Sequence, residues 1–268
     1  IFYFFKILRR ASSCDIIFAQ DPVSVGLPAM ITSKILRKKF LMRVAGDYAW
    51  EQAVQRFGVK EGIDEFQSKK YGLKVELLRW IQSFVVKRAD KVITPSFYFK
   101  NIVSSWVGGD EKVEAIYNGI NLNFNPTASG RIHNSKMKKI ISAGRLVPWK
   151  GFPTLIKIMK SLPEWQLIIA GDGPMKNELK TLIEELNLED RVKLVGAIPR
   201  EKLLTELQAS DLFVLNTSFE SFSFQTVEAM NLGIPVITTN IGNLKEIVEN
   251  DKEGILIEPN NREQMLSA

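Results

Sequence analysis

The sequence predicts an α/β protein with two parallel sheets, each covered by helices, and three observations predict it. From Lys138 onward, short apolar runs typical of buried strands alternate with amphipathic helical stretches. The same alternation, less complete, fills the first half of the chain. A polar segment at 125–137 separates the halves and is the predicted linker.

The second half, 138–268, predicts a doubly wound sheet whose strands and helices follow one another regularly. Glycines or prolines stand at most joins, as turns between strands and helices require. We expect this domain to be incomplete at its end. The strand runs are KIISAG, QLIIAG, VKLVG, DLFVLN, PVITTN and GILIE, and the helices are expected at 151–161, 174–187, 200–209, 223–232 and 242–249.

The first half, 1–124, predicts a smaller sheet of about four strands. A sheet with so few strands would be poorly covered, so we expect further strands before this segment. The connection at 46–71 is unusually rich in charge. The strand runs are DIIFAQ, FLMRVA, KVITPS and KVEAIYN, and the helices are expected near 25–37, 72–88 and 96–105.

Cysteine and histidine usage excludes several kinds of site. The single cysteine, Cys14, cannot form an internal disulfide, which indicates a reduced, cytoplasmic protein, and we expect its thiol to be buried. The single histidine, His133, lies in the polar linker and is poorly placed for acid–base work. Catalysis by a Ser/His/Asp triad and histidine-based metal sites are therefore disfavoured.

The net charge of +6 fits an enzyme with anionic ligands, a membrane-surface protein or a nucleic-acid binder. Positive charge is dense in residues 1–43, which carry eight Lys or Arg against two acids. Two readings stay open for this excess: solvated helix faces, or peripheral contact with anionic lipid on the inner membrane face. We expect no nucleic-acid partner.

The stretch from Glu220 to Glu228 follows the strand DLFVLN and carries the strongest signal for a site. Ser223 is placed to cap the next helix, which puts Glu228 in an early turn and leaves the N–H groups of Phe222 to Phe224 facing the crevice. Open α/β sheets bind ligands at the carboxyl ends of their strands. Taken alone, the pair also fits two ordinary surface glutamates.

A second loop strengthens this interpretation. Gly144 to Gly151 also follows a strand and opens a helix, so Arg145 and Lys150 are expected at the same sheet edge. Two cations there suit a diphosphate, because Arg binds two oxygens at once while Lys acts as a mobile point charge.

Together these motifs resemble the retaining glycosyltransferases of family 4, which have the GT-B fold: two Rossmann-like domains that face each other across a cleft. The resemblance covers nearly the whole chain. In the second half it rests on Gly144-Arg-Leu with Lys150-Gly151, Ala170-Gly-Asp-Gly-Pro174, Gly196 with Pro199, and Glu220 and Glu228 with seven residues between them (EX7E). In the first half it rests on Ala19-Gln-Asp-Pro22, Gly46-Asp-Tyr-Ala-Trp-Glu51, Thr94-Pro-Ser96 and Tyr117-Asn-Gly-Ile-Asn121.

The resemblance implies transfer of a hexosyl-type sugar, with retention, from a nucleotide-diphosphate sugar to a lipid-linked or cell-envelope glycan acceptor. It implies that Arg145 and Lys150 stabilise the departing diphosphate, that Glu220 holds the sugar and that Glu228 holds the ribose. The remaining donor-binding candidates are Gly144, Gly196, Ala197, Ile198, Phe222, Ser223 and Phe224, and the acceptor-side candidates are Gly46, Asp47 and Asn118.

We expect neither a metal nor a cofactor, because the chain has no Asp-X-Asp triplet of the kind metal-dependent glycosyltransferases use. One departure from the family lies in the first half. Many relatives carry a histidine where this chain has Ala45, so a role given to that histidine cannot be carried over, although Asp47 lies nearby.

The sequence also bears on three other functions. A sugar-nucleotide epimerase would share the fold but needs a different set of acids and histidines. A non-catalytic nucleotide-sugar-binding protein stays open as the main alternative. A dinucleotide oxidoreductase is disfavoured, because no Gly-X-Gly-X-X-Gly turn opens a helix in this sequence.

Overall fold

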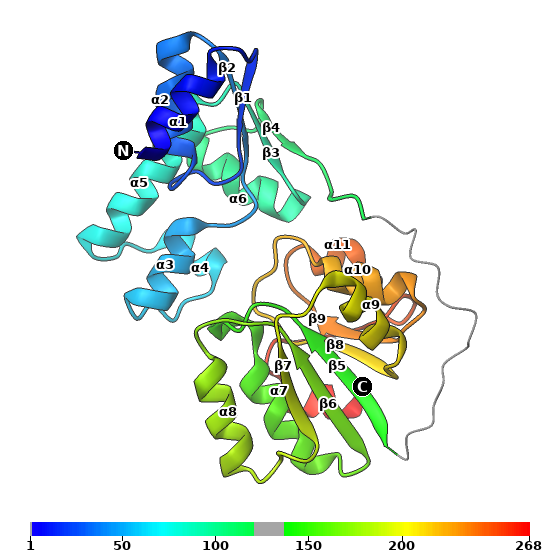
Figure 1. The fold of residues 1–268 in the computed structure, drawn as a ribbon. Helices are drawn as coiled ribbons and strands as arrows, with labels where there is room; N and C mark the ends of the chain where they lie inside the picture. Colours follow the sequence, from blue (N-terminus) through cyan, green and yellow to red (C-terminus); the bar gives the residue numbers. More distant parts are fainter. Residues whose placement is uncertain (1, 121–136) are drawn as a thin grey trace. The chain divides into compact units, whose positions relative to one another are not determined.

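A computed structural model describes residues 2–120 and 137–268, which form two compact units, Ile1–Asn118 and Gly119–Ala268 (Figure 1). The predicted linker, apart from Met137, and His133 lie outside the described residues. Each unit has one parallel sheet covered by helices, as the alternation of strands and helices predicts.

The first unit contains a four-stranded parallel sheet in the order β1-β2-β3-β4. Its strands are β1 (Ile16–Ala19), β2 (Lys39–Arg43), β3 (Lys91–Thr94) and β4 (Val113–Ala115). Its helices are α1 (Phe2–Ala11), α2 (Gly26–Leu36), α3 (Tyr48–Arg56), α4 (Ile63–Ser68), α5 (Leu73–Arg88) and α6 (Phe97–Val107).

Two helices of this unit were not predicted, and one expectation needs correction. The charged connection at 46–71 contains α3 and α4, because a few large side chains in it, such as Trp50 and Phe66, are buried against the rest of the unit. Cys14 is exposed rather than buried, because it follows the end of α1 at the surface.

The second unit contains a six-stranded parallel sheet in the order β10-β9-β8-β5-β6-β7. All six predicted strands are present, whereas the helix expected at 242–249 is limited to the four residues of α11. The strands are β5 (Lys138–Ala143), β6 (Trp165–Ala170), β7 (Val192–Gly196), β8 (Leu212–Leu215), β9 (Val236–Thr239) and β10 (Ile255–Ile257). The helices are η1 (Pro148–Lys150), α7 (Phe152–Ile158), η2 (Met159–Ser161), α8 (Lys176–Glu185), α9 (Arg200–Gln208), α10 (Phe224–Asn231), α11 (Leu244–Ile247) and α12 (Arg262–Ser267).

Helices cover both faces of the second sheet (Figure 1), and an apolar core lies on each face. Successive residues of a strand point to opposite faces. Accordingly, Ile140 packs with α7, α8 and α12, while Ile141 packs with α9, α10 and α11. Both clusters are apolar, so β5 is covered on both sides and lies at the centre of the domain.

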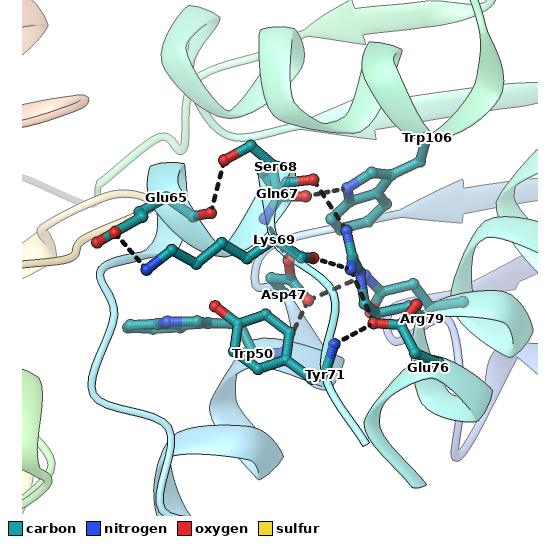
Figure 2. Close-up of polar contacts among 11 residues, drawn as sticks. Asp47, Trp50, Glu65, Gln67, Ser68, Lys69, Tyr71, Glu76, Arg79 and Trp106 are labelled. Atoms are coloured by element: carbon teal, nitrogen blue, oxygen red, sulfur yellow. Dashed lines mark hydrogen bonds and ion pairs between the residues drawn. The ribbon is translucent and has the colours of Figure 1, made fainter. Parts of the chain in front are cut away.

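A hydrogen-bond network around a buried carboxylate, Asp47, connects four helices of the first unit (Figure 2). It caps α3, where Oδ1 accepts hydrogen bonds from the backbone N–H of Trp50 at 3.0 Å and from Nε2 of Gln82 in α5 at 2.9 Å. Its Oδ2 accepts from Nε2 of Gln67 in α4 at 2.9 Å. The Oε1 of Gln67 in turn accepts a hydrogen bond from Nε1 of Trp106 in α6 at 2.8 Å. One network therefore connects all four helices, α3, α4, α5 and α6.

Burial raises the pKa of Asp47, against the lowering effect of these hydrogen bonds. A raised carboxyl pKa means that the native state holds a proton more readily than the unfolded chain does. The ionised form of Asp47 therefore stabilises the native state less than the protonated form does, so the free energy of unfolding rises as the pH falls through the native pKa of Asp47.

Substitution of Asp47 by Ala is expected to lower the free energy of unfolding by about 2–4 kcal/mol. The Trp50 N–H and the two Gln amides would lose their acceptor inside the protein. Urea unfolding followed by tryptophan fluorescence measures the change. Asp110→Ala is the control, since Asp110 is exposed and its change should stay within about 0.5 kcal/mol. Equal unfolding midpoints for the two variants would contradict the structural role given to Asp47.

Candidate functional site

The candidate site lies at the carboxyl ends of the second sheet, where the strand order reverses. Strand β5 pairs with β6 on one side and with β8 on the other, so the loops that follow these strands leave in opposite directions. A crevice at such a reversal point is where open α/β sheets bind ligands.

The loop after β5 is fixed by close contact with the loop after β6. Gly171 has φ +147°, and a Cβ there would lie 1.9 Å from the carbonyl oxygen of Gly144, so only glycine fits. The backbone N–H of Leu146 donates to the carbonyl of Asp172 at 3.0 Å, and that of Met175 donates back to Leu146 at 3.1 Å. These contacts explain the Gly-Asp-Gly motif and set the position of Arg145.

The loop after β8 is tied to η1, the short helix that ends at Lys150. The backbone N–H of Ser218 donates to the carbonyl of Trp149 at 2.7 Å. Nδ2 of Asn216 donates to the carbonyl of Gly151 at 3.0 Å. The glycine at 151 is required here, because its φ is +59° and a Cβ would lie 2.1 Å from the Asn216 carbonyl oxygen.

These ties bring Lys150 and Glu220 together. The Lys150 ammonium forms an ion pair with the Glu220 carboxylate, and the two side chains are only 10% and 14% exposed. The stem of Lys150 runs along Gly144, where a Cβ would lie 3.5 Å from its Cε. A cation and a carboxylate are thus held with little water at the point where the strand order reverses.

Glu228 lies on α10 and has its own cationic partner, Arg200 at the start of α9. The two form an ion pair with Nε and Oε1 2.7 Å apart, in which the Glu228 side chain is 6% exposed and that of Arg200 is 46% exposed. The sequence reasoning missed Arg200. It begins the helix after VKLVGAIP, so the strand-end rule that selected Arg145 and Lys150 also applies to it.

Two adjoining hollows lie beside these pairs. One, of about 240 Å³, is lined by Gly144 and Arg145 after β5 and by Ala197 and Ile198 after β7, close to Gly196. Ile198 also lines the second hollow, together with Arg200, Phe224 and Glu228. Most of the predicted donor-binding residues therefore lie along one continuous surface.

The cap at the start of α10 is the one that the sequence predicts. Ser223 is buried and its Oγ caps the helix by accepting from the N–H of Thr226 at 3.3 Å. Phe222 and Phe224 pack edge to face, with ring centroids 5.2 Å apart. The positive end of the helix therefore lies next to Glu220 in the sequence and at the same sheet edge.

The three acceptor-side candidates occupy different environments in the first unit. Gly46 and Ala45 line a hollow of about 230 Å³ at the carboxyl ends of β1 and β2, together with Asp21 and Glu51. Asp47 is buried, with both carboxylate oxygens bonded to the protein. Asn118 accepts a hydrogen bond from Arg43. The structure therefore places Gly46 in a hollow and gives the Asp47 side chain partners within the protein, and the predicted cleft between the two units stays a prediction.

Two features are absent from the part of the chain that the structure describes. Within 2–120 and 137–268, no group of three or more His, Cys, Asp or Glu side chains is arranged to hold a metal ion. Across these same ranges, no helix combines the length and apolar character needed to cross a membrane.

Solved structures with similar folds are glycosyltransferases of the GT-B type. Anabaena HepE, solved in complex with UDP and glucose, superposes with a TM-score of 0.79 at 23% identity, covering 98% of this chain and 69% of that one. The crystal structure of TarM gives a TM-score of 0.72 at 20% identity, covering 99% of this chain and 49% of that one. At these sequence identities, the structural similarity supports the assignment of the fold alone.

Curated relatives match at higher identity over shorter segments. An uncharacterized glycosyltransferase of Methanocaldococcus jannaschii is 32% identical over 185 residues, 64% of this chain and 47% of that protein. The GPI3 subunit of phosphatidylinositol N-acetylglucosaminyltransferase from Saccharomyces cerevisiae is 33% identical over 131 residues, 47% of this chain and 29% of that protein. The chain thus spans less than half the length of these relatives.

Family models match both halves of the chain. Residues 1–124 match the Glycosyltransferase Family 4 model, and residues 128–268 match the Glycosyl transferases group 1 model, which alone accounts for more than half of the sequence. With the two parallel-sheet domains and the strand-end site already described, the chain belongs to the group 1 glycosyltransferases.

Proposed function

We propose that this chain binds a nucleotide-diphosphate sugar on its second unit and belongs to an enzyme that transfers the sugar to a hydroxyl group of an acceptor, with retention and without a metal. The observation that carries the proposal is the buried pair of Lys150 and Glu220 beside Gly144, next to the hollow that Arg145 lines.

Arg145 and Lys150 supply the charge stabilisation that the reaction needs. As the bond between the sugar and the diphosphate breaks, its electron pair stays with the diphosphate, whose negative charge grows. Cations fixed beside the leaving oxygens stabilise that charge more in the transition state than in the ground state. This proposed role assigns the charge neutralisation to side chains rather than to a metal ion.

The ion pair couples donor binding to the availability of Glu220. A diphosphate at Gly144 competes with Glu220 for the Lys150 ammonium, since both are anions within reach of one small cation. Once Lys150 turns toward the diphosphate, the Glu220 carboxylate is released to accept hydrogen bonds from hydroxyls of the sugar. The carboxylate also lies close to the positive charge that the sugar ring gains during transfer.

Glu228 is proposed to hold the ribose. Its carboxylate has two oxygens, of which Oε1 accepts from Arg200, and it lines a hollow that continues to Ile198. The Arg200 guanidinium fixes the orientation of the carboxylate, so that ribose hydroxyls meet a preorganised acceptor. Backbone groups near Gly196 to Ile198 are proposed to contact the base.

The acceptor is proposed to be a glycan or a lipid-linked molecule bound by the first unit. The name of the yeast relative refers to phosphatidylinositol, and that of another relative, from Escherichia coli, refers to colanic acid biosynthesis. We likewise propose that the protein is cytoplasmic and that residues 1–43 make peripheral contact with the inner membrane face.

Sugar transfer is tested by incubating the intact protein with a panel of sugar nucleotides and candidate glycan acceptors. Mass spectrometry of the products should show a glycosylated acceptor together with an equal amount of nucleoside diphosphate. A protein that binds the sugar nucleotide tightly but releases no nucleoside diphosphate with any acceptor would favour the non-catalytic alternative.

The two glutamates are expected to differ in their kinetic effects. Glu228→Gln should raise the donor KM by about 10- to 150-fold with a much smaller change in kcat, because it weakens binding in ground and transition states alike. Glu220→Gln should lower kcat by more than it weakens donor binding, because its carboxylate matters most as the sugar gains positive charge. Steady-state kinetics with varied donor separates the two effects.

Glu201→Gln is the matched control, since Glu201 follows Arg200 on α9 and is exposed. Its kinetic constants should equal those of the unmodified protein. Full turnover in Glu220→Gln, or a loss of donor affinity alone in both site variants, would overturn the proposed division of roles.

A further inference from the structure

Helix α5 exposes a row of large apolar side chains on the first unit. Leu73, Leu77 and Trp80 are 91%, 56% and 60% exposed, and Phe84 is half-buried beside them. These four residues, the α5 stripe, stand at positions i, i+4, i+7 and i+11, which lie on one face of a helix. The stripe is about 16 Å long. A continuous apolar surface of this kind marks a binding surface more often than a solvated one.

The other face of α5 is fixed to the rest of the unit, so the stripe cannot turn inward. Val75, Val85 and Val86 are buried there, and Gln82 donates to Asp47. Arg79 donates to the carbonyl oxygens of Gln67 and Lys69 and pairs with Glu76, as Figure 2 shows. The helix is therefore anchored by one face and displays a second apolar face outward.

Aromatic rings and cations adjoin one another on this outward surface. Trp80 stacks on Phe84 with ring centroids 4.9 Å apart, and the Arg88 guanidinium lies 3.5 Å from the Phe84 centroid. At the other end, the Lys74 ammonium lies 6.0 Å from the ring of Phe57, which is also exposed. Aromatic rings packed beside charged Lys and Arg side chains suit the boundary between lipid and water.

The charged side chains around the α5 stripe indicate which kind of partner it binds. Lys70, Lys74, Lys87 and Arg88 are all exposed near it, and the single acid within α5, Glu76, is paired with Arg79. An apolar stripe edged by cations is the composition of helices that lie in the interface of membranes with anionic lipids. The positive charge of these Lys and Arg side chains attracts lipid phosphate groups and would repel a basic protein partner.

We propose that the α5 stripe is a membrane-interface site, which places its apolar side chains among the lipids while Lys74, Lys87 and Arg88 contact anionic headgroups. This site is separate from residues 1–43, where part of the basic charge is engaged within the unit. There, Lys39 pairs with Asp90, and Arg43 donates to Asn118. The proposal does not depend on the transfer reaction.

Vesicle sedimentation tests the proposal with the intact protein. Unmodified protein should bind vesicles containing phosphatidylglycerol and bind pure phosphatidylcholine vesicles much more weakly, with binding that falls as salt rises. Leu77→Ser with Trp80→Ser should weaken the partition coefficient at least tenfold, because it removes the central apolar area. Lys74→Gln with Lys87→Gln should weaken it about fivefold per charge.

The matched control alters α12 of the second unit, which also carries an exposed apolar side chain and an exposed cation four residues apart: Leu266→Ser with Arg262→Gln. Its partition coefficient should be unchanged, and circular dichroism should show all variants folded. Three results would overturn the proposal: no binding of the unmodified protein, loss of binding in the α12 variant but not in the α5 variants, or a dimer in solution that becomes a monomer when Leu77 and Trp80 are replaced.

Discussion

The ion pair between Lys150 and Glu220 is the interaction around which the second unit arranges its site. Bringing two charges into a place with little water requires that each meets the other in good geometry, since an unpaired buried charge is strongly destabilising. That geometry requires the loops after β5 and β8 to touch. The contact in turn requires glycine at position 151, where any side chain would collide with the Asn216 backbone.

The remaining features of the site follow from this constraint. With the β5 loop fixed, Arg145 lies against the hollow that reaches Ile198, and the β7 loop delivers Arg200 to Glu228. Two carboxylates and three cations then lie along one sheet edge, with the charges largely matched. Under the proposed function, an incoming diphosphate would meet cations that protein groups already hold in place, and Lys150 would exchange one anionic partner for another.

Much of the second unit could be predicted from the sequence, because six apolar runs ending in glycines and polar residues carry both the sheet and the strand-end residues Arg145, Lys150 and Glu220. The pairing of Arg200 with Glu228 could not be predicted, since it depends on how α9 and α10 pack. Helices α3 and α4 were missed for a similar reason. They depend on a buried carboxylate, Asp47, whose partner Gln82 is distant in sequence.

The most direct test of the account is whether Lys150 binds a diphosphate. Isothermal titration with uridine, guanosine, adenosine and cytidine diphosphates identifies the nucleotide that binds the unmodified protein most tightly. Lys150→Gln should weaken its affinity by about 10- to 100-fold, since a hydrogen-bonded charge contact is lost. Lys157→Gln, an exposed change on α7, should leave it unchanged. Equal affinities for the Lys150→Gln variant and the unmodified protein would contradict the central role given to the Lys150–Glu220 pair.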